Sequence, residues 1–459
     1  MKKRLLSGLI GLMAAQSALS MDLVETYEKA LSYDSGIAAA RASFEAQQAA
    51  SDVSLSTLLP QIGAYGEGNY IDVDGPNQDN SYRELNYGLQ LTQPLFRADA
   101  WFRYDASKFQ TESAQAEYNL AQQQLILDVA TAYFNVLRAR DTVTTARATE
   151  AAIQRQYEQA QERFDVGLIA ITEVYEARAS YDDSKSQRIA AENQLNVARE
   201  QLARLTGEYA EELDNLRRNF PLGRPDPMDP SAWEATALEQ NWSIQSALYE
   251  LNANEASLRE AKAGHYPTVD LNASYGKTDL DGIEDPASIQ TQRDGTTTRG
   301  TIGLTLNVPL YSGGGTQAGV RQQRSLVTVA EQSLNTVRRD VRVNTRSLFL
   351  TVNNNVETAS ALEQTIVSRR SALDATRAGY EVGTRNIVEV LDAERAYYVA
   401  LRDYANARYD YVINSLQLKQ AAGTLSPRDL IDLNNWLSAA APGIEALANE
   451  EEILDDPTQ

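Results

Sequence analysis

The chain has 459 residues, with 63 acidic against 42 basic side chains and a formal net charge of −21. This charge argues against nucleic acid as a partner, because phosphate binding requires the opposite sign. With no Cys and one His, the sequence lacks a disulfide framework, thiolate ligands and the residues of most nucleophilic and metal chemistry, so we expect neither an enzyme nor a cofactor.

The first residues have the order of a secretory signal peptide. Basic residues at 2–4 precede an apolar run over 5–15, and small residues follow at 18–20. The apolar run is too short to anchor the chain across a bilayer. We therefore expect residues 1–20 to be an export signal, and no later stretch is apolar enough for a transmembrane helix.

A helix is expected over 22–59, followed by two strands at about 61–70 and 85–95. In the second strand Leu85, Tyr87 and Leu89 alternate with polar residues, and a period of two is typical of a strand with one apolar face. A polar turn at 75–77 separates the two strands.

A very long helix is expected next, because residues 95–166 contain neither Gly nor Pro. At about 1.5 Å per residue it approaches roughly 100 Å, too long for a compact globule. Gly167 interrupts this pattern, and a returning helix is expected over 172–205. Gly is the usual residue where a helix stops in a left-handed conformation, so residues at about 163–172 are predicted to form a helical hairpin tip.

The same plan then repeats. The stretch GYEVGTRNIVEVLDAERAY, residues 379–397, matches RFDVGLIAITEVYEARASY upstream at Val, Gly, Ile, Glu, Val, Ala and Tyr. Gly383 therefore predicts a second hairpin tip at about 379–387. Strands are expected at about 267–277 and 300–310, with a second long helix after them. The chain is thus predicted to divide into a signal peptide (1–20), a first repeat (21–207), a Pro-rich linker (208–231), a second repeat (232–423), a short segment (424–440) and a disordered acidic tail (441–459).

The four strands suggest a membrane barrel. About ten tilted residues cross a bilayer as a strand, and alternation of apolar with polar positions is typical of outer-membrane barrels. Tyr65, Tyr87 and Tyr275 are suitable for the membrane interfaces. Four strands do not close alone, so copies must pool them: a dimer supplies eight strands with a filled interior, and a trimer twelve with a lumen, which the small polar inner faces favour. The alternative is the edge of a soluble sandwich.

The helices, rich in Ala and Gln, suit close packing around an aqueous bore, because helices that face water inside need only narrow apolar seams. A filled coiled coil is the alternative, although it would require stronger Leu/Ile heptads.

The two tips and the duplicated plan together resemble the outer membrane factor family, the channels of tripartite efflux and type I secretion systems. The resemblance rests on residues 163–184 and 379–426 and covers the mature chain. It implies an α+β membrane protein, a homotrimer in the outer membrane. Its twelve-stranded β-barrel would continue into a twelve-helix periplasmic α-barrel, with an equatorial region formed by the linker and the C-terminal segment. The implied partners are outer membrane lipid, a periplasmic adaptor (membrane fusion protein) and an inner-membrane pump of the RND, ABC or MFS type.

Two carboxylates near the second tip, Glu389 and Asp392, are three residues apart and share one helix face. If three copies converge there, a ring of carboxylates would select and bind cations. The resemblance implies an acidic constriction at these positions, although the family pattern has Asp where this chain has Glu389. A solvated helix face is the alternative, and a glycosidase-like pair lacks the necessary cleft.

A gate latch is the second site that the resemblance implies. Arg385 and Tyr380 would bond to Thr172 and Glu173 on the neighbouring hairpin and hold the entrance closed. Alternatively, Arg385 only caps the preceding helix. The first tip has Ile169 where Arg385 stands, so the two tips are not expected to be interchangeable.

The predicted function is therefore a passive exit duct that a pump and an adaptor open at the periplasmic end. The alternative is an exported coiled-coil scaffold or a periplasmic adaptor, which would need no lipid-facing strands. The residues do not distinguish drugs from protein toxins as cargo.

Overall fold

The computed structural model describes residues 20–75, 78–282, 294–439 and 441. The expected signal peptide (apart from Ser20) and the tail beyond 441 lie outside them. The chain divides into two compact units, one drawing on Met1–Ala38, Ala121–Asn241 and Val341–Gln459, the other on Ala39–Leu120 and Trp242–Asp340.

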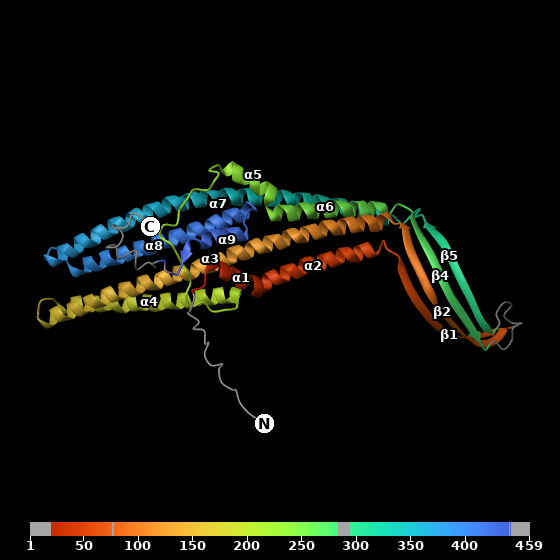
Figure 1. Ribbon diagram of the computed structural model, residues 1–459, viewed down its shortest axis with the longest axis horizontal. Helices are drawn as coiled ribbons and strands as arrows, with labels where there is room; N and C mark the ends of the chain where they lie inside the picture. Colours follow the sequence, from red (N-terminus) through yellow and green to blue (C-terminus); the bar gives the residue numbers. More distant parts are fainter. Residues whose placement is uncertain (1–19, 76–77, 283–293, 440, 442–459) are drawn as a thin grey trace, which may run out of the picture. The chain divides into compact units, whose positions relative to one another are not determined.

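The second unit contains an antiparallel sheet of four strands in the order β1-β2-β4-β5. The strands lie side by side in Figure 1. Their bounds are β1 Gln61–Gly75, β2 Gln78–Phe96, β4 Thr268–Asp281 and β5 Gly295–Asn307. β1 and β2 extend closer to the turn that connects them than the sequence predicts. β5 ends at Asn307, two residues before Pro309, because Pro has no N–H to donate to a neighbouring strand.

The register gives the sheet one apolar and one polar face. Cross-strand neighbours on the apolar side include a row formed by Ile62, Leu91, Ala273 and Ile302. The next row, on the opposite side, is Gly63, Gln90, Ser274 and Thr301. The Ser274 and Thr301 hydroxyls are 2.6 Å apart, whereas the Ile302 side chain is 78% exposed. Among the described residues, nothing covers this apolar face.

Tyr65 lies on the polar face, unlike Tyr87 and Tyr275. It pairs with Gly88, which in turn pairs with Gly276. A Cβ added at Gly276 would lie 2.5 Å from the Tyr65 hydroxyl, so the two glycines leave room for the ring. This register corrects the prediction that placed Tyr65 together with Tyr87 and Tyr275. Because side chains alternate along a strand, Tyr65 lies on the opposite face of the sheet.

Each pair of strands is preceded by two helices rather than one. The single helix expected over 22–59 is wrong: α1 (Leu23–Tyr33) ends and α2 (Ser35–Ser56) begins around Asp34. The Asp34 carboxylate accepts a hydrogen bond from the Ile37 N–H at 3.0 Å, satisfying a free donor of the second helix. In the second repeat α5 (Pro230–Gln240) and α6 (Trp242–Ala263) are separated at Asn241.

The two long helices follow the strand pairs as expected. They are α3 (Ala98–Asp165) and α7 (Gly315–Glu381). The returning helices α4 (Ile171–Thr206) and α8 (Ile387–Ala421) run back beside them. Just before α3, Arg97 binds both carboxylate oxygens of Asp270 on β4, at 3.0 and 2.8 Å, which ties the helix start to the sheet.

The core of the first unit lies along the middle of α3. Large side chains from four helices are fully or almost fully buried there: Ile126, Val129, Tyr133, Phe134, Leu137, Leu202, Val352, Leu401 and Leu418.

The Pro-rich linker and the C-terminal segment meet at this level. β3 (Asn215–Leu216) pairs with β6 (Leu437–Ser438), and α9 (Pro427–Asn434) lies between α8 and β6 in the chain. The Tyr133 hydroxyl donates to the backbone carbonyl of Asp214 at 2.9 Å, so the buried core of α3 anchors the linker.

The predicted α+β fold with a duplicated order of helix, strand, strand, long helix and helix is confirmed. Within the described residues, no helix is both long and apolar enough to cross a membrane.

Candidate functional site

The two hairpin tips have the same backbone geometry. Gly167 and Gly383 adopt positive φ angles of 77° and 76°. At the first tip the Leu168 N–H donates to the Arg163 carbonyl at 2.8 Å, and at the second the Thr384 N–H donates to the Gly379 carbonyl at 2.8 Å. These bonds are the Schellman pattern, which favours Gly because other residues are strained at positive φ.

The second tip carries a local charge pair. The Arg385 guanidinium donates to the Glu389 carboxylate at 2.6 Å, four residues along, and the two side chains are 59% and 39% exposed. The Asn386 side chain caps α8 by accepting from the Glu389 N–H at 2.9 Å. Within the described residues Arg385 therefore binds the first turn of α8, the helix that follows it.

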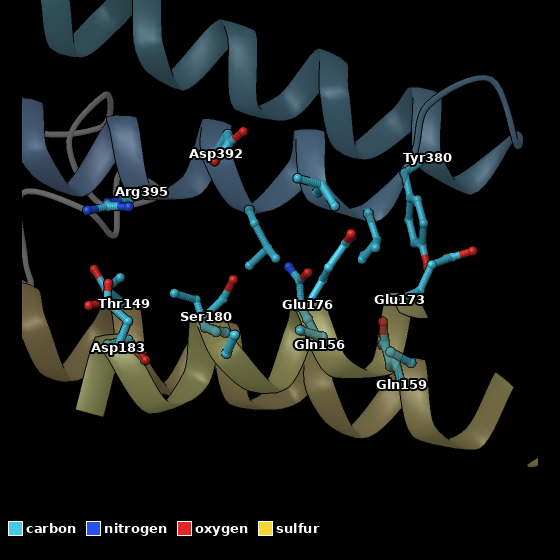
Figure 2. A pocket seen from close by; sticks show the side chains of 18 of the residues that line it. Thr149, Gln156, Gln159, Glu173, Glu176, Ser180, Asp183, Tyr380, Asp392 and Arg395 are labelled. Carbon is cyan, nitrogen blue, oxygen red and sulfur yellow. The ribbon is translucent and has the colours of Figure 1, made fainter. Parts of the chain in front are cut away.

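At the tips, a bond between the two hairpins involves Tyr380 and a residue that sequence reasoning missed. The Arg163 guanidinium at the end of α3 donates to the Tyr380 hydroxyl at 3.2 Å. Figure 2 shows the Tyr380 ring extending toward the start of α4, where Glu173 lies. Thr172 and Glu173 occupy the exposed first turn of that helix. No pattern in the sequence pairs Arg163 with Tyr380, since Gly379 is the residue that matches Arg163 in the repeat.

A cavity of about 410 Å³ separates the two hairpins just behind the tips. Side chains from α3, α4 and α8 line it together with Tyr380, and Asp392 is among them (Figure 2). Asp392 is exposed and Glu389 is half-buried. The sequence pattern contains no sign of this cavity.

Buried charges lie further along the same hairpins. Glu394, 7% exposed, accepts from Arg377 at 3.1 Å within the second hairpin. Asp141 on α3 accepts from the Tyr409 hydroxyl at 2.7 Å. Burial raises the pKa of Asp141 to about 6, against the lowering effects of the Tyr409 hydrogen bond and of the Arg140 and Arg408 charges. Burial also raises the pKa of Tyr409 well above its usual value.

Comparisons with known proteins agree with this architecture. The chain matches the family model described as outer membrane efflux protein over residues 26–208 and 233–424. It is 38% identical to the outer membrane protein TolC of Escherichia coli (strain K12), covering 95% of this chain and 90% of that protein. It is 28% identical to the alkaline protease secretion protein AprF of Pseudomonas aeruginosa, covering 96% and 93%.

Among solved structures, the Campylobacter jejuni CmeC outer membrane channel has a TM-score of 0.75 at 17% identity, covering 91% of this chain and 90% of that one. This likeness shows the shared fold of hairpins and sheet.

Proposed function

The chain belongs to the outer membrane efflux protein family, and on this premise we propose that it is a trimeric exit duct for drug efflux and type I protein secretion. The observation that carries the proposal is the four-stranded sheet with one exposed apolar face, joined to two long helical hairpins. An apolar face of this kind, backed by a polar face, suits a strand wall between lipid and water.

The edges of the sheet support assembly with further copies of the chain. β1 and β5 are the outer strands of the order β1-β2-β4-β5, and in hydrocarbon an unpaired strand edge leaves backbone N–H and C=O groups without partners. Pairing of β5 in one copy with β1 in the next removes both edges. Three copies supply twelve strands, and the row of Gly63, Gln90, Ser274 and Thr301 then faces a lumen wide enough for water.

The helical hairpins then form the periplasmic continuation of the duct. In this arrangement an adaptor and an inner-membrane pump dock at the tips, around Gly167 and Gly383. The duct is passive, and the pump supplies the energy for transport.

The closed entrance is held by weak bonds at the tips. Tyr380 bonds to Arg163 on the neighbouring hairpin, and Arg385 presents an exposed guanidinium that Thr172 and Glu173 of an adjacent hairpin can engage on assembly. Exposed ion pairs each contribute about 0.2–1 kcal/mol. Such bonds bias the closed state and yield to a docking partner.

This latch is tested by single-channel recording in planar bilayers. Arg385→Ser should raise the conductance, because the closed entrance loses a bond. Arg41→Ser is the matched control, since it removes an exposed pair with Glu45 at 2.9 Å that is also four residues apart in the sequence, and it should leave conductance unchanged. Equal conductance for wild type and Arg385→Ser would contradict the latch.

The constriction is formed by Glu389 and Asp392. Three copies would place six of these carboxylates around the entrance, and a carboxylate ring favours cations over anions. The double variant Glu389→Gln/Asp392→Asn should shift the reversal potential in a salt gradient toward lower cation selectivity. An unchanged reversal potential would place the two carboxylates away from the narrowest point.

The function as a whole is tested by deleting the gene and assaying drug susceptibility and secreted protein in parallel. A rise in drug susceptibility or a loss of secreted protein, reversed by the wild-type gene, supports the duct. Outer membrane fractionation and migration on an unboiled gel should report a heat-modifiable trimer. A monomer soluble in Sarkosyl would instead indicate an exported scaffold or an adaptor.

A further inference from the structure

The cavity between the two hairpins has dimensions suited to a small ligand. Its volume of about 410 Å³ lies within the range of roughly 300–1,000 Å³ that small-molecule sites occupy. All of its lining residues come from one chain and from one compact unit.

One wall of the cavity is acidic. Glu173, Glu176 and Asp183 line it from α4. The helical rise of about 1.5 Å per residue separates the first two by roughly 4.5 Å along the axis, with the third about 10 Å further. In the described part of the chain, Glu173 and Glu176 have no ion-pair partner. The wall therefore presents a linear series of carboxylates to the cavity.

The opposite wall, on α8, is mainly apolar, although Asp392 and Arg395 also line it. Ile387, Val388 and Leu391 line the cavity from α8. Two guanidinium groups, those of Arg163 and Arg395, also line it, and they are outnumbered by the four carboxylates of Glu173, Glu176, Asp183 and Asp392. A ligand here would thus contact carboxylates on one side and hydrocarbon on the other.

A buried polar atom in this cavity lacks a partner. Gln156 on α3 is 7% exposed, lines the cavity, and its Oε1 atom has no hydrogen-bond partner. Figure 2 shows Gln156 among the side chains that project between the hairpins, near Glu176. Among the described residues no group donates to this atom, and a buried acceptor left unpaired is costly, so an N–H or O–H donor of a ligand would satisfy it.

We propose that this cavity binds a linear aliphatic polyamine. Its ammonium groups pair with the carboxylates of α4, one N–H donates to Gln156, and its methylene segments lie on Ile387, Val388 and Leu391. Because the ligand contacts both hairpins, it holds them together and favours the closed entrance. This inference goes beyond the proposed function: binding is measured on the purified protein and does not depend on transport.

Calorimetric titration of the full chain, purified in detergent at physiological salt, with spermidine as the probe, tests the proposal. Wild type should bind one spermidine per chain. Glu173→Gln/Glu176→Gln should lower the affinity about tenfold, since each exposed ammonium–carboxylate pair contributes modestly. Gln156→Leu should lower it about fivefold through loss of the buried hydrogen bond, with unfolding profiles recorded to verify folding.

Two controls separate this site from general attraction to a protein of net charge −21. Glu200→Gln, an exposed position on the same helix outside the cavity, should leave the affinity unchanged. An uncharged diol of similar length should not bind. Equal spermidine affinity in wild type and the Glu173/Glu176 double variant, or displacement of spermidine by millimolar Mg²⁺ alone, would overturn the proposal.

Discussion

Removing the Tyr409 hydroxyl should destabilise the protein in a pH-dependent way. The hydroxyl donates to Asp141 at 2.7 Å, and the two side chains are 6% and 4% exposed. The Tyr409 ring also packs on Phe134 with centroids 5.6 Å apart. Tyr409→Phe keeps this ring contact, so the variant isolates the hydrogen bond to the carboxyl.

The magnitude follows from the charge state of Asp141. Its pKa is about 6 in the folded protein against 3.8 as the ordinary value. The folded state therefore binds the proton more tightly, and ionisation of this group costs about 3 kcal/mol of folding free energy as pH rises from about 4 to above 6. Above pH 6 the hydroxyl bonds to a carboxylate, and removal of the hydroxyl should lower the free energy of unfolding by about 2 kcal/mol. Near pH 5 the hydroxyl bonds mainly to a neutral carboxylic acid, and its removal should lower the free energy of unfolding by only about 1 kcal/mol.

Thermal unfolding of the detergent-solubilised protein, followed by circular dichroism at about pH 5 and pH 8, measures this difference. The drop in Tm caused by Tyr409→Phe should be clearly larger at the higher pH. In an Asp141→Asn background the same substitution should have an effect that does not change with pH. Equal drops in the wild-type background at both pH values would refute the assignment of the raised pKa to Asp141.

Further predictions concern the tips and a close backbone approach. Tyr380→Phe should raise single-channel conductance in planar bilayers, because it removes the bond to Arg163; conductance at the wild-type level would show that this bond does not hold the entrance. Gly423→Ala should lower Tm strongly, since φ is +79° and a Cβ would lie 2.3 Å from the Gln240 carbonyl oxygen. Gly319→Ala is its control: no atom lies within 4 Å of the added Cβ, and inside α7 Ala is favoured over Gly by about 1 kcal/mol, so Tm should hold or rise.

Local sequence signals determined the repeated plan of the chain. The helices over 98–165 and 315–381 were predictable because long stretches without Gly or Pro favour uninterrupted helix. The tips were predictable because Gly167 and Gly383 each follow such a stretch, and a left-handed helix end requires little beyond that residue. Alternation in residues 85–92 likewise predicted a strand with two unlike faces.

Tertiary structure decided the features in which distant residues meet. The break at Asn241 depends on its side chain donating to the Ala421 carbonyl at 2.9 Å, and Tyr65 lies on the polar face because β1 pairs with β2 in one particular register. Three further features depend on segments that no local sequence pattern relates. They are the Tyr380–Arg163 bond, the burial of Asp141 and the cavity at Gln156. Hydrogen bonding within a helix or turn is encoded by neighbours in the sequence, whereas burial and the pairing of charges depend on which helices pack together.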